Sequence, residues 1–130
     1  VDSFANIDFA DLRDALAEAI AAEGISEPVI SHFSQMLDRT AADLDHARGL
    51  YAAAEILSFC SAAVAARLAT EAREHIALCP LSIAVHAQAG APREVRIAYR
   101  PPAIDTPGGK AARELMARIV ARAAALVGRD

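Results

Sequence analysis

Residues 81–100, LSIAVHAQAGAPREVRIAYR, decide the fold of this chain. Apolar side chains alternate with polar or small ones on both sides of a turn signal, AGAP at residues 89–92. Because successive side chains of a strand point to opposite faces, this alternation predicts two strands, Ile76–Ala87 and Glu94–Arg100, each with one buried face. The short turn between them predicts an antiparallel hairpin.

Amphipathic helices are predicted on either side of this hairpin in the sequence. Apolar residues recur at three- and four-residue steps over residues 8–23, where Asp8 suits the N-cap and Gly24 the position after the end. The same spacing recurs over residues 110–127. Residues 61–72 are rich in alanine, the residue with the highest helix propensity, and are also predicted to be helical.

The middle of the chain is predicted from weaker signals. Pro28 favours extended backbone at the residue before it, and a short strand is expected at residues 29–35, followed by a helix at residues 36–44. Residues 51–60 fit either a strand or a buried helix, because their alanines favour neither period. The apolar run at residues 56–60 favours the strand.

The expected elements follow the order α-β-α-β-α-β-β-α. That order predicts an α+β fold with two layers, in which helices pack on a mainly antiparallel sheet. A chain of 130 residues is the usual size of one domain, so residues 1–130 are expected to form a single domain. No internal repeat or linker divides the sequence.

Composition narrows the classes of partner. The formal net charge is −4, with 13 Lys and Arg against 17 Asp and Glu, and this balance disfavours nucleic acid, which needs a basic surface. No apolar run is long enough to span a membrane, and no signal-peptide pattern opens the sequence. A cytoplasmic location is expected, or a periplasmic one if a segment was removed before Val1.

Four segments carry a resemblance to a bacterial family. In order they are MLDRTAADL at residues 36–44, EILSFCSA at residues 55–62, CPLSIAV at residues 79–85 and AYRP at residues 98–101. Together they resemble the family known as domain of unknown function 302. The resemblance implies a small bacterial α/β domain that forms a homodimer or a higher homo-oligomer and has no established activity. Members of the family often carry Tyr where this chain has His86.

Histidines offer the most concrete candidate site. His32 is predicted to lie on a strand beside apolar residues, and a neutral imidazole in an apolar pocket is a common iron ligand of haem. We therefore expect a ligand-binding module, most concretely one for non-covalent haem, since the chain has no Cys-x-x-Cys-His site for covalent attachment. His32 and His86 are the candidate metal ligands. The expected pocket residues are His32, Phe33, Met36, Phe59 and His86. The alternative for each histidine is an ordinary surface or hydrogen-bonded role.

Two cysteines support a second hypothesis. Cys60 is expected at the end of one strand and Cys79 inside another. If those strands are neighbours, the thiols could form a redox pair or sensor, or bind a soft metal, although two small buried apolar side chains are the simpler interpretation. A third hypothesis is a structural or interaction domain without a small ligand. No set of nucleophile, base and acid can be assembled from the sequence, so a non-catalytic role is favoured. The glycines before Lys110 lack the Ser or Thr of a phosphate loop.

Overall fold

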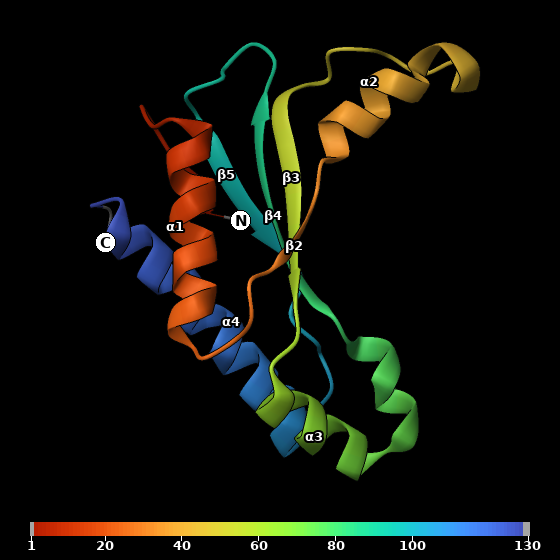
Figure 1. The fold of residues 1–130 in the computed structure, drawn as a ribbon, viewed down its shortest axis with the longest axis vertical. Helices are drawn as coiled ribbons and strands as arrows, with labels where there is room; N and C mark the ends of the chain where they lie inside the picture. Colours follow the sequence, from red (N-terminus) through yellow and green to blue (C-terminus); the bar gives the residue numbers. More distant parts are fainter. Residues whose placement is uncertain (1, 129–130) are drawn as a thin grey trace.

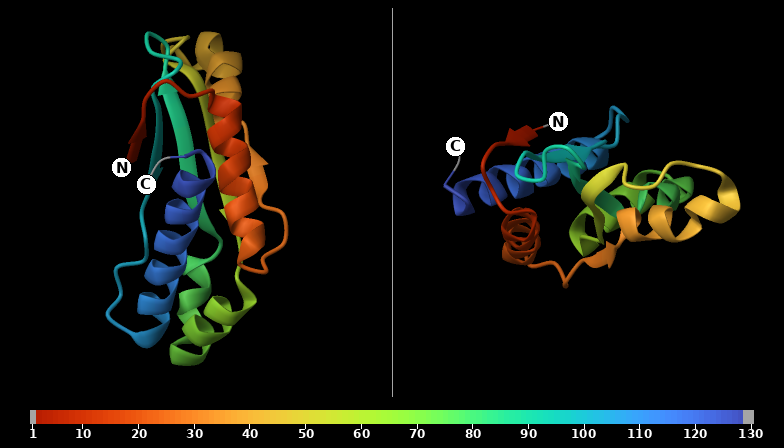
Figure 2. Two further views of the ribbon diagram at one scale, coloured as in Figure 1. Left: turned by 90° about the vertical axis from the view of Figure 1, so that its left-hand side faces the viewer. Right: turned by 90° about the horizontal axis from the view of Figure 1, so that it is seen from above.

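A computed structural model describes residues 2–128 of the chain. Five strands form one antiparallel sheet in the order β1-β5-β4-β3-β2, and helices α1 and α4 lie together on one of its faces (Figures 1 and 2). The strands are β1 (Asp2–Phe4), β2 (Val29–Ser31), β3 (Tyr51–Phe59), β4 (Leu81–Gln88) and β5 (Val95–Tyr99). The helices are α1 (Phe9–Ala22), α2 (Phe33–Leu44), α3 (Ala62–Glu71), the 3-10 helix η1 (Arg73–Leu78) and α4 (Pro107–Leu126). The predicted α+β class and element order are confirmed.

The central strand β4 gives the sheet two different faces. Ile83 and Val85 are fully buried, whereas Ala84 and His86, which point the other way, are partly exposed. We call the first side the covered face, because α1 and α4 pack on it. We call the second the bare face; its residues on the three central strands are Ala54, Ile56, Ser58, Ser82, Ala84, His86, Arg96 and Ala98. The candidate site lies on the bare face.

The two long helices bury the apolar stripes that the sequence predicts. In α1, Leu12, Leu16 and Ile20 are fully buried, and the helix ends before Gly24, whose φ of +77° is a left-handed conformation that favours glycine. In α4, Met116 and Ile119 are equally buried and belong to the same apolar core. Among residues 2–128, no helix has the length and hydropathy needed to cross a membrane.

Two predicted strands are wrong at one end. The expected strand 29–35 stops at Ser31, because α2 begins at Phe33 and the Ser34 hydroxyl bonds the backbone of Ala54 on β3. The expected strand 76–87 begins only at Leu81, since residues 73–78 form η1. In η1 the side chain of Ile76 is 75% exposed, so its apolar character marks no buried strand. The short edge strand β1 was not predicted.

Helix α4 begins three residues earlier than predicted, at Pro107, and α3 meets its N-terminus. The Thr106 hydroxyl accepts from the Gly109 N–H at 3.0 Å, and a Glu71 carboxylate oxygen accepts from the Gly108 N–H at 2.6 Å. These contacts satisfy amides that a helix otherwise leaves unpaired, and the negative charge suits this end of the helix dipole. Gly108 and Gly109 therefore allow the N-terminus of α4 to pack closely against α3.

The Glu71 contact predicts an acid-dependent loss of stability. Hydrogen bonds from Thr106 and then from the Gly108 amide lower the pKa of Glu71 below its ordinary value of 4.5. A carboxylate with a lowered folded pKa stabilises the protein fully above its unfolded pKa, and this contribution is lost as the pH falls through the folded pKa. We expect Glu71→Gln to be less stable than wild type above pH 4.5 and equal to it in stronger acid. Urea titrations at several pH values, with the exposed Glu74→Gln as control, measure this; a constant difference at all pH values would contradict it.

Candidate functional site

A small pocket lies on the bare face where α2 meets the sheet. Its volume is about 280 Å³, close to the lower end of the range for small-molecule sites. Small and aliphatic side chains of β3, β4 and β5 form its floor, and three rings stand around it. The floor residues are Ala54, Ile56, Ala84 and Ala98, and the ring residues are Phe33, Tyr51 and His86.

The three rings form a continuous edge-to-face chain. The ring centroids of Phe33 and Tyr51 are 6.2 Å apart at an interplanar angle of 73°, and those of Tyr51 and His86 are 5.9 Å apart at 76°. Such T-shaped pairs are a favourable geometry for aromatic rings. Ser34 holds Phe33 in place, because its hydroxyl accepts from the Ala54 N–H at 3.1 Å and donates to the Ala54 carbonyl at 3.4 Å.

His86 is the polar group of this pocket. Its Nδ1 is shielded from solvent and has no hydrogen-bond partner among the described residues. Burial lowers the pKa of His86 below its ordinary value of 6.5, and the positive charge of Arg96, its cross-strand partner, lowers it further. At neutral pH the ring is therefore a neutral imidazole with one nitrogen unused. A buried polar atom without a partner calls for a physical reason, and a bound molecule that supplies the missing hydrogen bond is one such reason.

The pocket continues along the sheet into a second hollow of about 370 Å³. The two hollows share the floor residues Ile56, Ala84 and Ala98. The second hollow ends at Ser82 and Arg100. We call the two hollows together the trough.

His32 lies apart from this site. It precedes α2 at the N-cap, not on the predicted strand, and its Nδ1 is 3.3 Å from a carboxylate oxygen of Glu55. The same carboxylate binds Nη1 of Arg13, on α1, at 3.1 Å. Glu55 is the cross-strand partner of the buried Val85 on the covered face, so the His32 ring and the His86 ring are directed to opposite sides of the sheet. The structure does not bring the two candidate metal ligands together.

The other predicted pocket residues are also divided. Phe33 lines the pocket, but Phe59 is 4% exposed within the core of the covered face, and Met36 lies on the surface of α2 at 36% exposure. Within the described residues, no three His, Cys, Asp or Glu side chains gather as a metal site would require. Tyr51 was missed, since its place beside His86 depends on a register shift between Tyr51 and Ala53 that no residue pattern reveals.

The two thiols do come near each other. Phe59 pairs with Leu81 at the end of the β3–β4 ladder. Cys60 directly follows β3, and Cys79 lies two residues before Leu81, so both are just beyond that pair. Both cysteines are free; Cys60 is exposed and Cys79 is half-buried. Burial raises the pKa of the Cys79 thiol, and negative charge on Cys60 raises it further. Cys60 is therefore the more available of the two for reaction.

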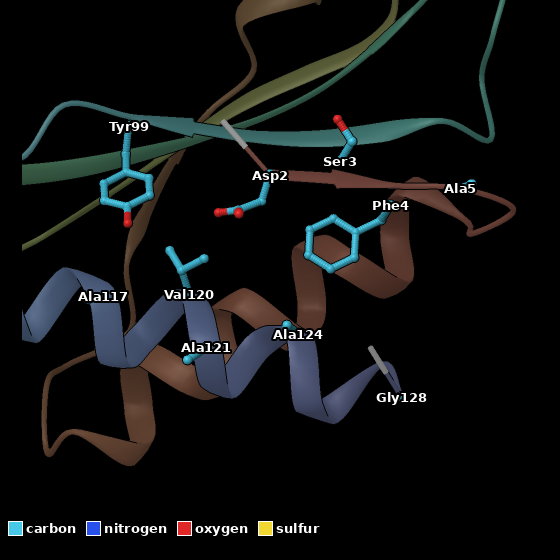
Figure 3. Close-up of a pocket in the computed structure, with 10 residues that line it drawn as sticks. All are labelled: Asp2, Ser3, Phe4, Ala5, Tyr99, Ala117, Val120, Ala121, Ala124 and Gly128. Atoms are coloured by element: carbon cyan, nitrogen blue, oxygen red, sulfur yellow. The ribbon is translucent and has the colours of Figure 1, made fainter. Parts of the chain in front are cut away.

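A larger hollow of about 760 Å³ lies between α4 and strands β1 and β5 (Figure 3). Its walls are mostly alanine with Phe4 and Val120, and the polar side chains of Asp2 and Tyr99 point into it. Its lining includes Asp2 and Gly128, the first and last residues that the structure describes. Among the residues that the structure describes, the buried side-chain polar atom without a partner is Nδ1 of His86, so we take the trough as the candidate site.

Replacing His86 by phenylalanine is expected to stabilise the protein. The variant keeps a ring beside Tyr51 and removes the unpaired nitrogen. We expect this to raise the free energy of unfolding by about 1 kcal/mol at neutral pH. Because the folded pKa of His86 is lowered, the unfolded chain binds a proton first as the pH falls below 6.5, and wild type loses stability there.

The difference between His86→Phe and wild type should therefore widen from pH 7.5 to pH 5.5. Urea titrations at both pH values measure it. Equal differences at the two pH values would show that the His86 pKa is the same in the folded and unfolded protein.

Comparisons with known proteins agree on one family. The family model described as "Domain of unknown function DUF302" matches residues 3–126. The crystal structure of an uncharacterized conserved DUF302 protein from Bacillus stearothermophilus aligns with a TM-score of 0.64 at 19% sequence identity, covering 96% of this chain and 93% of that one. At this identity the structural likeness shows a shared fold. No curated protein matches the chain.

Proposed function

Since this chain belongs to the family described as domain of unknown function DUF302, whose description assigns no activity, we propose a function from its own site: a non-catalytic module that binds a small ligand in the trough. The observation that carries the proposal is the buried, unpartnered Nδ1 of His86 beside an aromatic pocket. Mostly apolar pockets with few polar groups are the usual form of small-molecule sites.

The neutral state of His86 suits it to orient a bound ligand. A neutral imidazole can donate from one nitrogen and accept at the other, so it can orient a ligand without transferring a proton. No carboxylate among the described residues bonds the ring, so an acid–base pair is not formed there. The rings of Phe33 and Tyr51 supply flat apolar contact area.

Binding of 8-anilino-1-naphthalenesulfonate, a dye that fluoresces in apolar sites, tests this proposal. Ala98→Leu fills the floor of the trough, whereas Ala121→Leu fills the larger hollow beside α4 and serves as the matched control. We expect dye emission with wild type and Ala121→Leu, and at least about tenfold weaker binding to Ala98→Leu. Equal binding to all three proteins would overturn the proposal.

Haem binding through His32 is a separate proposal, because His32 does not line the trough. The pocket volume of about 280 Å³ suits a ligand smaller than a haem macrocycle, and His32 and His86 face different sides of the sheet. Haem binding through His32 stays a prediction with a direct test. A Soret shift on adding haemin that is lost in His32→Ala would support it; no shift, or the same shift in that variant, would reject it.

We propose as a second candidate a thiol sensor, favoured by the β3–β4 register that brings Cys60 and Cys79 to one end of the ladder. An added diazene oxidant such as diamide would accept two electrons and two protons from the thiols and become a hydrazine, while the two sulfurs form one bond. Thiol titration with Ellman's reagent after denaturation should find both thiols lost in wild type. Cys60→Ser should keep its remaining thiol. Retention of both thiols in wild type would reject the candidate.

A further inference from the structure

The bare face carries positive charge in an acidic protein. The chain has a formal net charge of −4, yet the charged residues on this face of β5 and at its C-terminal end are Arg96 and Arg100; Glu94 directly precedes the strand, beside Arg96. Glu55, the one acidic residue of β3, also lines the pocket, but it is the cross-strand partner of the buried Val85 and its carboxylate binds Arg13 on α1. A concave apolar surface that carries an unpaired charge attracts ligands of the opposite sign.

The two arginines differ in their partners. Arg96 lies 3.9 Å from a carboxylate oxygen of Glu94, which partly neutralises it. Arg100 is exposed, and within residues 2–128 it forms no ion pair or side-chain hydrogen bond. Arg100 lines one end of the trough, and a guanidinium with unused donors matches the two oxygens of a carboxylate.

The trough also has a defined length. Its aromatic end is at His86 and its arginine end is at Ser82 and Arg100. At about 3.3 Å per residue along β4, the distance from His86 to Ser82 is roughly 13 Å. The floor between these ends is Ile56, Ala84 and Ala98, which offers no polar side chain. A ligand that fills it has an apolar middle.

We propose that the ligand is an elongated apolar carboxylic acid, whose carboxylate is bound by Arg100 and whose chain lies along the trough toward His86. The inference rests on the proposed function of the trough and adds the chemical class of the ligand. A hydrogen-bonding group at the far end of the chain would meet the unpaired nitrogen of His86. Because that nitrogen is closed to solvent, the side chains around it have to move before a chain end can reach it.

The protein carries its own reporter of binding at the aromatic end. It has no Trp and two Tyr: Tyr51 lines the aromatic end of the trough, and Tyr99 lines both the arginine end of the trough and the hollow beside α4, into which its ring points. In a Tyr99→Phe background, tyrosine fluorescence reports on Tyr51 alone. Octanoate, 1-octanol and 8-hydroxyoctanoate are the probes. They compare a charged, a neutral and a doubly polar ligand of one chain length.

Arg100→Gln is the test variant, and Arg122→Gln, an exposed arginine on α4, is its matched control. We expect octanoate to bind Arg100→Gln at least about tenfold more weakly than wild type or Arg122→Gln, and 1-octanol to bind all three equally. We further expect 8-hydroxyoctanoate to exceed octanoate in affinity for wild type and to lose that advantage in His86→Phe.

Each alternative outcome has a distinct meaning. If 1-octanol binds as tightly as octanoate and Arg100→Gln has no effect, the carboxylate inference is overturned while the trough remains a binding site. If neither probe changes the Tyr51 fluorescence and the naphthalenesulfonate dye also fails, the proposed function is overturned with it. If the protein is a dimer by sedimentation and octanoate binds only on dissociation, a second copy covers the bare face and the inference is overturned.

Discussion

Gly109→Ala is expected to lower the free energy of unfolding by about 3 kcal/mol, which corresponds to a fall in melting temperature of roughly 10 °C. A Cβ at Gly109 would lie 2.3 Å from the carbonyl oxygen of Ile104 and 2.6 Å from its Cγ1. Backbone cannot yield as a flexible side chain can, so the segment before α4 would have to move away from the helix.

That segment is held in place by a second contact, which raises the cost of moving it. Nη1 of Arg113 donates to the carbonyl of Ile104 at 2.7 Å and to that of Pro102 at 3.1 Å. A shift of the Ile104 backbone would weaken these bonds together with the helix cap at Thr106. The effect of the added methyl group therefore spreads over one connected set of contacts.

Thermal and urea unfolding of three glycine variants measure this effect. Gly90→Ala is the matched control, because Gly90 has no neighbour within 4 Å of an added Cβ and is expected to change stability by no more than about 0.5 kcal/mol. Gly108→Ala meets only the Glu71 carboxylate, which can turn aside, so we expect an intermediate loss. Equal stability of Gly109→Ala and Gly90→Ala would show that the Ile104 segment is not packed as described.

The fold could be predicted where side-chain period and burial agree. Residues 81–87 alternate because one side of β4 is covered by helices, and that one-sided burial produces the pattern. The start of α2 could not be predicted, since Phe33 packs on Tyr51 and Ser34 bonds Ala54, both distant in the sequence. Similarly, Ile76 is apolar but exposed. Its apolar side chain extended the predicted strand to residue 76, although that residue belongs to η1.

The candidate site could be predicted only in part, for the same reason. His86 was predicted as a pocket residue and as the second candidate metal ligand, and it does line the pocket. Its partner was expected to be His32, but strand register places His32 beside Glu55 on the other side of the sheet. A sequence shows which residues alternate, whereas the identity of the residues across the ladder depends on pairing between strands.

Ile83→Ala and Ile56→Ala should separate the two faces of the sheet. Ile83 is fully buried on the covered face at the centre of β4, so its truncation leaves a cavity and is expected to cost about 3–4 kcal/mol. Ile56 is half-buried on the bare face, where its truncation only widens the trough. We expect a loss of about 1 kcal/mol or less there.

The binding readout should show the opposite order. Ile56→Ala removes floor contacts from the ligand and should weaken octanoate binding severalfold, whereas Ile83→Val, a milder change that keeps the core filled, should bind like wild type. The free energy of unfolding of Ile56→Ala, Ile83→Ala and wild type is then measured in urea at two protein concentrations. If Ile56→Ala costs as much stability as Ile83→Ala, and its cost depends on protein concentration, then the bare face is packed against another copy of the chain. If Ile56→Ala lowers the free energy of unfolding only slightly, and by the same amount at both protein concentrations, then no second copy covers the bare face and a small ligand can reach it.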